Sequence, residues 1–134
     1  FKADQHQTVK NAAVLAKELQ GKGFDIVSGG TDNHVMLVNL NKFDITGKDA
    51  EAAMSKAGIV LNKNTIPFET RSPFITSGIR IGTPAATTRG MKEAQMQEIA
   101  GYINDVISNL NDDTVLHGIN SDVEQLCSGF PIYK

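Results

Sequence analysis

Apolar residues between 91 and 110 recur at intervals of three and four, and this pattern constrains the fold of the chain more than any other. It predicts an amphipathic helix with one apolar face. The same spacing predicts helices over 4–21 and 113–128. A shorter helix is expected after Thr46, where an acid three residues later resembles a capping box, and it should close at Gly58.

Short apolar runs between these helices predict strands over 24–28, 35–40, 59–61 and 79–82. The run at 35–40 is nearly all apolar, as expected of a strand that is covered on both faces. Helices interleaved with short strands indicate an α/β fold of the α+β sandwich type, with a small mixed sheet covered by helices. The order and direction of the strands cannot be read from the sequence.

Bulk properties limit the size and the class of the protein. A length of 134 residues suits one domain, spanning 1–134, with its own core. A net charge of -2 argues against a nucleic-acid binder, and no apolar run is long enough to cross a membrane. The single Cys127 excludes an internal disulfide and fits a reducing compartment. The first residues resemble no signal or transit peptide and lack an initiator Met, so we expect a piece of a longer protein.

All three arginines lie between residues 71 and 90, among prolines, glycines and hydroxyl residues. A guanidinium group is suited to planar, two-point recognition of a carboxylate or phosphate. Arg80 lies inside a short apolar run, where a charge needs a partner, so we expect it to form an anion site. The alternative is a structural arginine paired with one of the 15 acids. We expect Arg89 to form a structural ion pair and Arg71 to be exposed.

The segment 62–77 shows no periodicity and contains two prolines, which predicts a long loop. Long structureless loops inside a compact domain are often functional. Taken alone, Asn64 is a turn residue and Phe74 a loop anchor.

Asn33 and His34 could belong to a catalytic or metal cluster, but the histidine pattern argues against it. The three histidines are His6, His34 and His117, and none has zinc-ligand spacing to another or to Cys127. We therefore expect no metal site, and a supporting role for Asn33 and His34 at a turn.

Four motifs of the chain resemble, in order and spacing, the carboxy-terminal domain of the serine hydroxymethyltransferase family. They are Ser-Gly-Gly-Thr-Asp-Asn-His at 28–34, Asn-Lys-Asn-Thr-Ile-Pro at 62–67, Arg-Ser-Pro-Phe at 71–74 and Thr-Ser-Gly-Ile-Arg-Ile-Gly-Thr-Pro-Ala at 76–85. The resemblance covers the whole chain. It implies the small C-terminal domain of a fold-type I pyridoxal-phosphate enzyme, with residues 1–21 as an interdomain helix and the larger, lysine-bearing domain absent.

The resemblance also implies a function. The parent would be a pyridoxal-phosphate-dependent transferase of one-carbon metabolism and glycine biosynthesis, working as a homodimer or tetramer. It would interconvert serine and tetrahydrofolate with glycine and 5,10-methylenetetrahydrofolate. Arg80 would bind the substrate carboxylate, and Asn64 with Ser72, Pro73 and Phe74 would form part of the folate pocket. None of the ten lysines resembles the family's cofactor lysine, so the isolated chain should be inactive.

Two alternatives remain open. The chain could be a non-catalytic module that binds or senses a small molecule, or the small domain of another pyridoxal-phosphate enzyme. A lysine-bearing domain encoded upstream would be required only by the enzyme interpretations.

Overall fold

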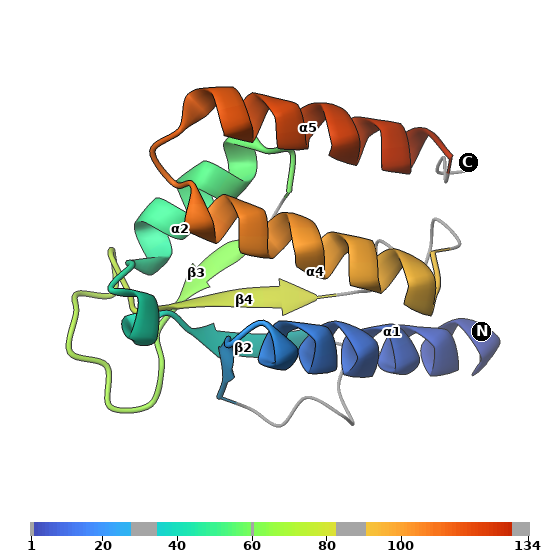
Figure 1. Cartoon of the computed structure of the whole chain (residues 1–134). Helices are drawn as coiled ribbons and strands as arrows, with labels where there is room; N and C mark the ends of the chain where they lie inside the picture. The colour runs from blue at the N-terminus through green and yellow to red at the C-terminus, as the bar shows by residue number, and fades with distance from the viewer. Residues whose placement is uncertain (1, 28–34, 60, 83–90, 130–134) are drawn as a thin grey trace.

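The computed structural model describes residues 2–27, 35–59, 61–82 and 91–129 (Figure 1). Its α-helices are α1 (Lys2–Gly21), α2 (Gly47–Lys56), α4 (Glu93–Ser108) and α5 (Asp113–Ser128), and a short 3-10 helix, η1, spans Asn41–Phe43. Its strands are β1 (Asp25–Ile26), β2 (Val35–Asn39), β3 (Asn62–Asn64) and β4 (Gly78–Gly82). The expected class, a small sheet covered by helices, is confirmed. The strands lie in the order β1-β2-β4-β3. We expected a mixed sheet, but every described strand pair is antiparallel.

The helices were predictable because their periodicity and caps are local. The three long helices are confirmed to within two residues at each end. Thr46 begins α2 as expected, since its side-chain oxygen accepts a hydrogen bond from the backbone N–H of Asp49 at 3.1 Å. Gly58 follows the helix with a φ of 79°, a left-handed conformation that favours glycine.

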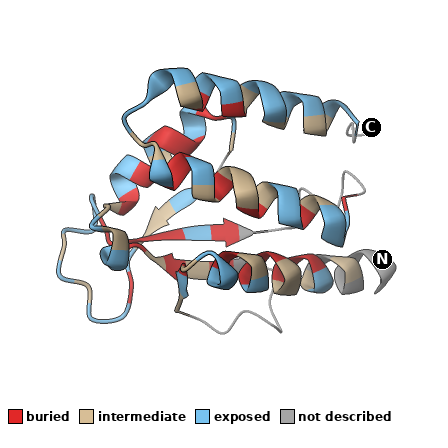
Figure 2. Cartoon of the chain, in the orientation of Figure 1, coloured by how far each residue is buried: buried red, intermediate tan, exposed pale blue. Residues whose placement is uncertain are grey.

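The core lies between the helices and one face of the sheet, and α1 packs along α4 (Figures 1 and 2). In the central strands β2 and β4, alternate side chains point to this core because strand residues alternate between faces. The core-facing residues are Met36, Val38, Ile79 and Ile81, all at most 6% exposed.

The opposite face of the sheet is open within the described part of the chain. Leu37 is only half-buried and Arg80 is exposed on that side. The expectation that the strand at 35–40 is covered on both faces is therefore wrong for these residues. An all-apolar run does not reveal whether helices cover one face of the strand or both, because the covering helices are placed by the tertiary fold.

The strand expected at 59–61 is also wrong. The backbone N–H of Ile59 donates to the carbonyl of Met54 at 2.8 Å, so this residue closes the turn that follows α2 and does not join the sheet. Residue 60 lies outside the described residues, and Leu61 is buried but outside the strand. Pairing with β4 begins at Asn62, so the first three residues of the expected loop form an edge strand instead. At the other edge, β1 is shorter than the run expected over 24–28.

Candidate functional site

Arg80 stands at the centre of the open face of the sheet. It lies opposite Leu37 of β2 and Asn62 of β3, so these three side chains share one face. Among the described residues, no carboxylate lies within ion-pair distance of its guanidinium. The charge does not enter the core, because strand alternation turns it outward while both neighbouring isoleucines point inward. The structural ion-pair alternative thus finds no support in the described residues.

Asn64 lies on the same open face as Arg80. It pairs with Gly78 in the ladder, two positions along the strands from the Asn62–Arg80 pair. Its side-chain amide donates to the carbonyl of Thr65 at 2.8 Å and is half-buried. The structure therefore brings together two residues that lie 16 positions apart in the sequence.

Lys63, which lies between Asn62 and Asn64, faces the opposite side of the sheet. Its backbone N–H donates to Glu51 Oε2 of α2 at 2.8 Å, and its Nζ lies 3.7 Å from Glu51 Oε1. This contact ties β3 to α2. It also sets which residues of the short edge strand reach the open face.

The turn that carries Ser72, Pro73 and Phe74 projects beyond the end of the sheet where β4 begins (Figure 1). All three residues are exposed, and 81% of Phe74 is accessible. Ser72 organises the turn, since its Oγ accepts from the N–H of Phe74 at 3.1 Å. Its carbonyl accepts from the N–H groups of Ile75 and Thr76, both at 2.9 Å.

The carboxylate of Glu69, which sequence reasoning missed, closes the loop on itself. Its Oε1 accepts from the N–H of Ser77 at 2.7 Å. Its Oε2 accepts from the Ser77 hydroxyl at 2.5 Å and from the N–H groups of Thr70 and Arg71 at 3.1 and 3.3 Å. Burial by itself raises the pKa of Glu69, but the hydrogen bonds from Ser77, Arg71 and Ile66 together lower it below its ordinary value. The only sequence signal was an acid two residues before Arg71 in a proline-containing loop.

We expected Arg71 to be exposed, but its side chain is part of the same hydrogen-bond network. Its Nη1 donates to Asn41 Oδ1 at 2.6 Å and to Ser77 Oγ at 2.9 Å, and its side chain is 27% exposed. Its Nη2 lies 4.0 Å from Asp44. These contacts reach across to η1 and the residue that follows it, which are remote in sequence, so local pattern could not reveal them.

The N-terminus of α2 holds the other end of the loop. The N–H groups of Gly47 and Lys48 donate to the carbonyls of Thr76 and Ile75 at 3.1 and 2.9 Å, which satisfies two of the free donors at a helix start. Thr76 is buried with a φ of 62°, a left-handed conformation that costs a β-branched residue about 1–3 kcal/mol. Its Oγ1 donates to the carbonyl of Gly78 at 3.2 Å. The surrounding contacts hold this strained residue in place.

Comparison with known proteins decides the family. A family model described as serine hydroxymethyltransferase matches residues 1–103. The chain belongs to the serine hydroxymethyltransferase family. It is 66% identical over 133 residues to a serine hydroxymethyltransferase of Methanosarcina barkeri and 56% identical over 133 residues to one of Marinobacter nauticus. Each match covers 99% of this chain but 32% of the relative, so the chain spans about a third of the length of these relatives.

Three residues named in the sequence analysis, Asn33, His34 and Arg89, lie outside the described part of the chain. His117 is exposed on α5. In the described residues there is no group of three or more His, Cys, Asp or Glu side chains able to hold a metal ion. In the same residues, no helix has the length and apolar character needed to span a bilayer.

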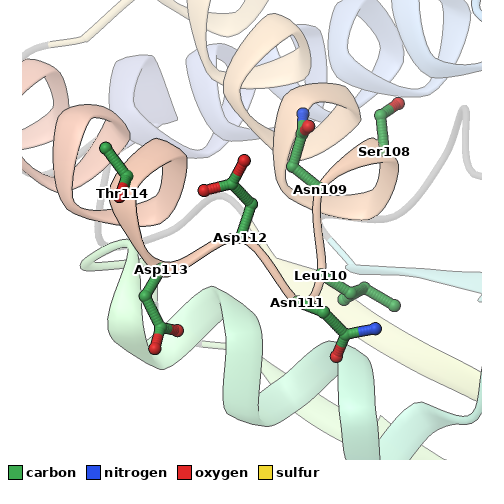
Figure 3. Close-up of a pocket in the computed structure, with 7 residues that line it drawn as sticks. All are labelled: Ser108, Asn109, Leu110, Asn111, Asp112, Asp113 and Thr114. Carbon is green, nitrogen blue, oxygen red and sulfur yellow. The ribbon is translucent and has the colours of Figure 1, made fainter.

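Two hollows formed by described residues of α4 and α5 include none of the family-motif residues. One, of about 490 Å³, lies at the turn between α4 and α5 (Figure 3). Its lining residues are Ser108, Asn109, Leu110, Asn111, Asp112, Asp113 and Thr114. Asp112 already serves as the N-cap of α5, accepting from the N–H of Val115 at 3.2 Å. We therefore place the candidate site at the open sheet face and its loop, where the motif residues meet, rather than in this hollow.

A second hollow, of about 180 Å³, lies beside Tyr102 between α4 and α5. The pKa of the Tyr102 hydroxyl is raised above its ordinary value, mainly by burial and to a smaller extent by three nearby carboxylates. The carboxylates are those of Glu98, Asp122 and Asp105. An acidic wall of this kind does not suit the binding of an anionic substrate.

Proposed function

We propose that this chain is the C-terminal domain of a serine hydroxymethyltransferase. The whole enzyme would interconvert serine and tetrahydrofolate with glycine and 5,10-methylenetetrahydrofolate. The observation that carries the proposal is the position of Arg80, an exposed guanidinium without an acidic partner among the described residues, on the same sheet face as Asn64. Family membership adds the expectation that this face meets an amino acid substrate and a folate.

Arg80 would bind the α-carboxylate of serine or glycine through two parallel N–H···O hydrogen bonds. A strand residue is a rigid base for such a contact, since its backbone is bonded on both sides, to β2 and to β3. Fixing the carboxylate sets the orientation of the amino acid, and thereby of the bond at Cα that is to break. Orientation of this kind is a large contribution to catalysis.

The described residues fit a supporting role toward pyridoxal phosphate rather than its covalent attachment. Lys63 is next to the proposed site in sequence, but its side chain pairs with Glu51 on the helical side of the sheet. The lysine and most contacts of the cofactor would therefore belong to the remaining, larger domain. When bound, pyridoxal phosphate supplies the electron sink for bond cleavage at Cα. This chain would contribute the carboxylate clamp that orients the substrate beside it.

The loop would form one wall of the folate pocket. An amide such as that of Asn64 presents a donor and an acceptor side by side, which match the edge of a pterin ring. Ser72, Pro73 and Phe74 would pack against the less polar part of the folate, and the exposed aromatic ring of Phe74 is free to do so. Asn33 and His34 would support the site.

The assembly of the whole enzyme completes the proposal. Residues 1–21 would connect the two domains, and the enzyme would be a cytoplasmic homodimer, or a tetramer of dimers. The isolated chain would be inactive because it lacks a cofactor lysine.

Replacing Arg80 by lysine in the full-length enzyme tests the carboxylate clamp. Lysine keeps the charge but loses the two-point geometry, and a charged hydrogen bond contributes about 1.5–3 kcal/mol. We expect the KM for serine and the Kd for glycine to rise roughly 10- to 100-fold. Unchanged values for both would refute the assignment of Arg80.

Replacing Asn64 by alanine tests the folate wall. We expect a higher KM for tetrahydrofolate with little change in the KM for serine. Asn111→Ala is the matched control, because Asn111 is an exposed asparagine in the turn between α4 and α5. If Asn64→Ala retains wild-type affinity for tetrahydrofolate, the folate assignment is wrong. A full-length protein with no hydroxymethyltransferase activity at all would favour the non-catalytic alternative.

A further inference from the structure

The Ser72–Phe74 turn cannot hold its own shape by burial. Its three residues are exposed, and Phe68 on the preceding part of the loop is 98% accessible. Such a turn depends on hydrogen bonds for its order, and those that Ser72 makes within the turn do not fix it to the rest of the domain. A binding wall made from such a turn therefore depends on whichever groups fix its two ends.

The end that follows the turn is fixed by α2. The helix N-terminus donates from Gly47 and Lys48 to the carbonyls of Thr76 and Ile75. Ser77 continues this anchor, since its carbonyl accepts from the N–H of Leu40 at 2.8 Å. These backbone contacts connect the end of the turn to the core, but they do not touch the residues that lead into it.

The carboxylate of Glu69 is what joins the two ends of the turn. It bonds to the N–H groups of Thr70 and Arg71 on the leading side, and to both the N–H and the hydroxyl of Ser77 on the following side. Arg71 strengthens the closure through its own bond to the same hydroxyl. The side chain of Glu69 therefore acts as a clasp, because it is bonded to residues on both sides of the turn, and Arg71 adds one further bond across it.

Only a carboxylate can make this clasp. The two oxygens of Glu69 accept the hydrogen bonds from Thr70, Arg71 and Ser77 and donate none. A glutamine of the same shape would put an NH₂ group in place of one of the two oxygens. The backbone N–H groups that donate to that oxygen would then lose their acceptor. Ser77 is fully buried, so the loss of a partner for its N–H would be costly and would release the following end of the turn.

We propose that Glu69 is a positioning residue for the folate substrate, acting through the Ser72–Phe74 turn without touching the folate itself. The inference rests on the proposed function, in which this turn forms part of the folate wall. It predicts that a change at Glu69 weakens the binding of tetrahydrofolate but not that of serine. Arg80, the proposed contact for serine, is held in place by the pairing of β4 with β2 and β3 and does not depend on Glu69.

The test compares Glu69→Gln, Glu69→Asp and Phe74→Ala in the full-length enzyme. The measurements are the KM for tetrahydrofolate, the KM for serine, kcat and the melting temperature. We expect Glu69→Gln to raise the KM for tetrahydrofolate about 10-fold, the effect of losing one charged hydrogen bond, while the KM for serine stays within about twofold. Glu69→Asp keeps the acceptor oxygens on a shorter side chain and should recover part of the loss.

The three variants separate failure of this inference from failure of the proposed function. If Phe74→Ala raises the KM for tetrahydrofolate but Glu69→Gln does not, the positioning role is wrong and the folate wall stands. If neither variant changes it, the folate role of the turn is wrong and the inference falls with it. If Glu69→Gln affects both substrates and kcat equally, Glu69 supports the whole domain, which also overturns the proposal. Should Glu69→Gln fail to fold, the same selective criterion applies to Glu69→Asp.

Discussion

Replacing Gly47 by alanine should disrupt the junction between α2 and the loop. Gly47 is buried at the first position of the helix, where its N–H donates to the carbonyl of Thr76. An alanine Cβ would lie under 3.0 Å from both Thr76 Oγ1 and the carbonyl oxygen of Gly78, closer than real Cβ contacts. A third contact, with Lys63 Cβ at 3.2 Å, is also tight. One of the two clashing atoms is backbone, so a rotamer change cannot relieve the clash.

The magnitude follows from three contributions. Overpacking of a filled site costs about 1–3 kcal/mol. Moving α2 away from the loop weakens the hydrogen bonds from Gly47 and Lys48, each contributing about 1 kcal/mol. The lower entropy of the unfolded alanine chain offsets about 0.5–1 kcal/mol of this. We expect a net loss of about 2–4 kcal/mol in the free energy of unfolding.

Urea denaturation of the 134-residue chain, followed by far-ultraviolet circular dichroism, measures this loss. Gly118→Ala is the matched control, because Gly118 is exposed within α5 and an added Cβ meets nothing within 4 Å. That variant should be more stable by up to about 1 kcal/mol, the gain in helix propensity. If Gly47→Ala is as stable as the wild type, the helix and the loop are not rigidly joined and the reasoning is refuted.

Two further predictions concern α4 and α5. Asp112→Ala removes the N-cap bond to Val115 and should lower the free energy of unfolding by about 1 kcal/mol, seen as a lower urea midpoint; an unchanged midpoint would mean that this cap contributes nothing. Ultraviolet titration of a Tyr133→Phe variant, in which Tyr102 is the remaining tyrosine, should show phenolate forming at higher pH in the folded chain than in urea. Because the folded pKa is the higher one, the stability linked to Tyr102 is present below the unfolded pKa and lost as pH rises toward the folded value; equal titration in both states would contradict this.

The helices could be predicted because the information for them is local. Apolar spacing of three and four marks the buried stripe of a helix whatever it packs against, and Thr46 caps its own helix through a residue three positions away. The strand at β4 was visible for a similar reason, as an apolar run. The position of Asn64 on an edge strand was not, because Asn62–Asn64 has no strand pattern of its own and pairs only where β4 offers a free edge.

Sequence motifs by themselves determined the family, the helical framework and the residues of interest, Arg80 and Asn64 among them. Tertiary structure alone decided how those residues are used. Which face of the sheet the helices cover determines that Arg80 points outward. Glu69 closes the loop by bonding to Ser77 at the other end of it, and Arg71 joins the loop to Asn41 of η1. Such contacts form only when the chain has folded, since hydrogen bonding to distant partners leaves no periodic trace along the sequence.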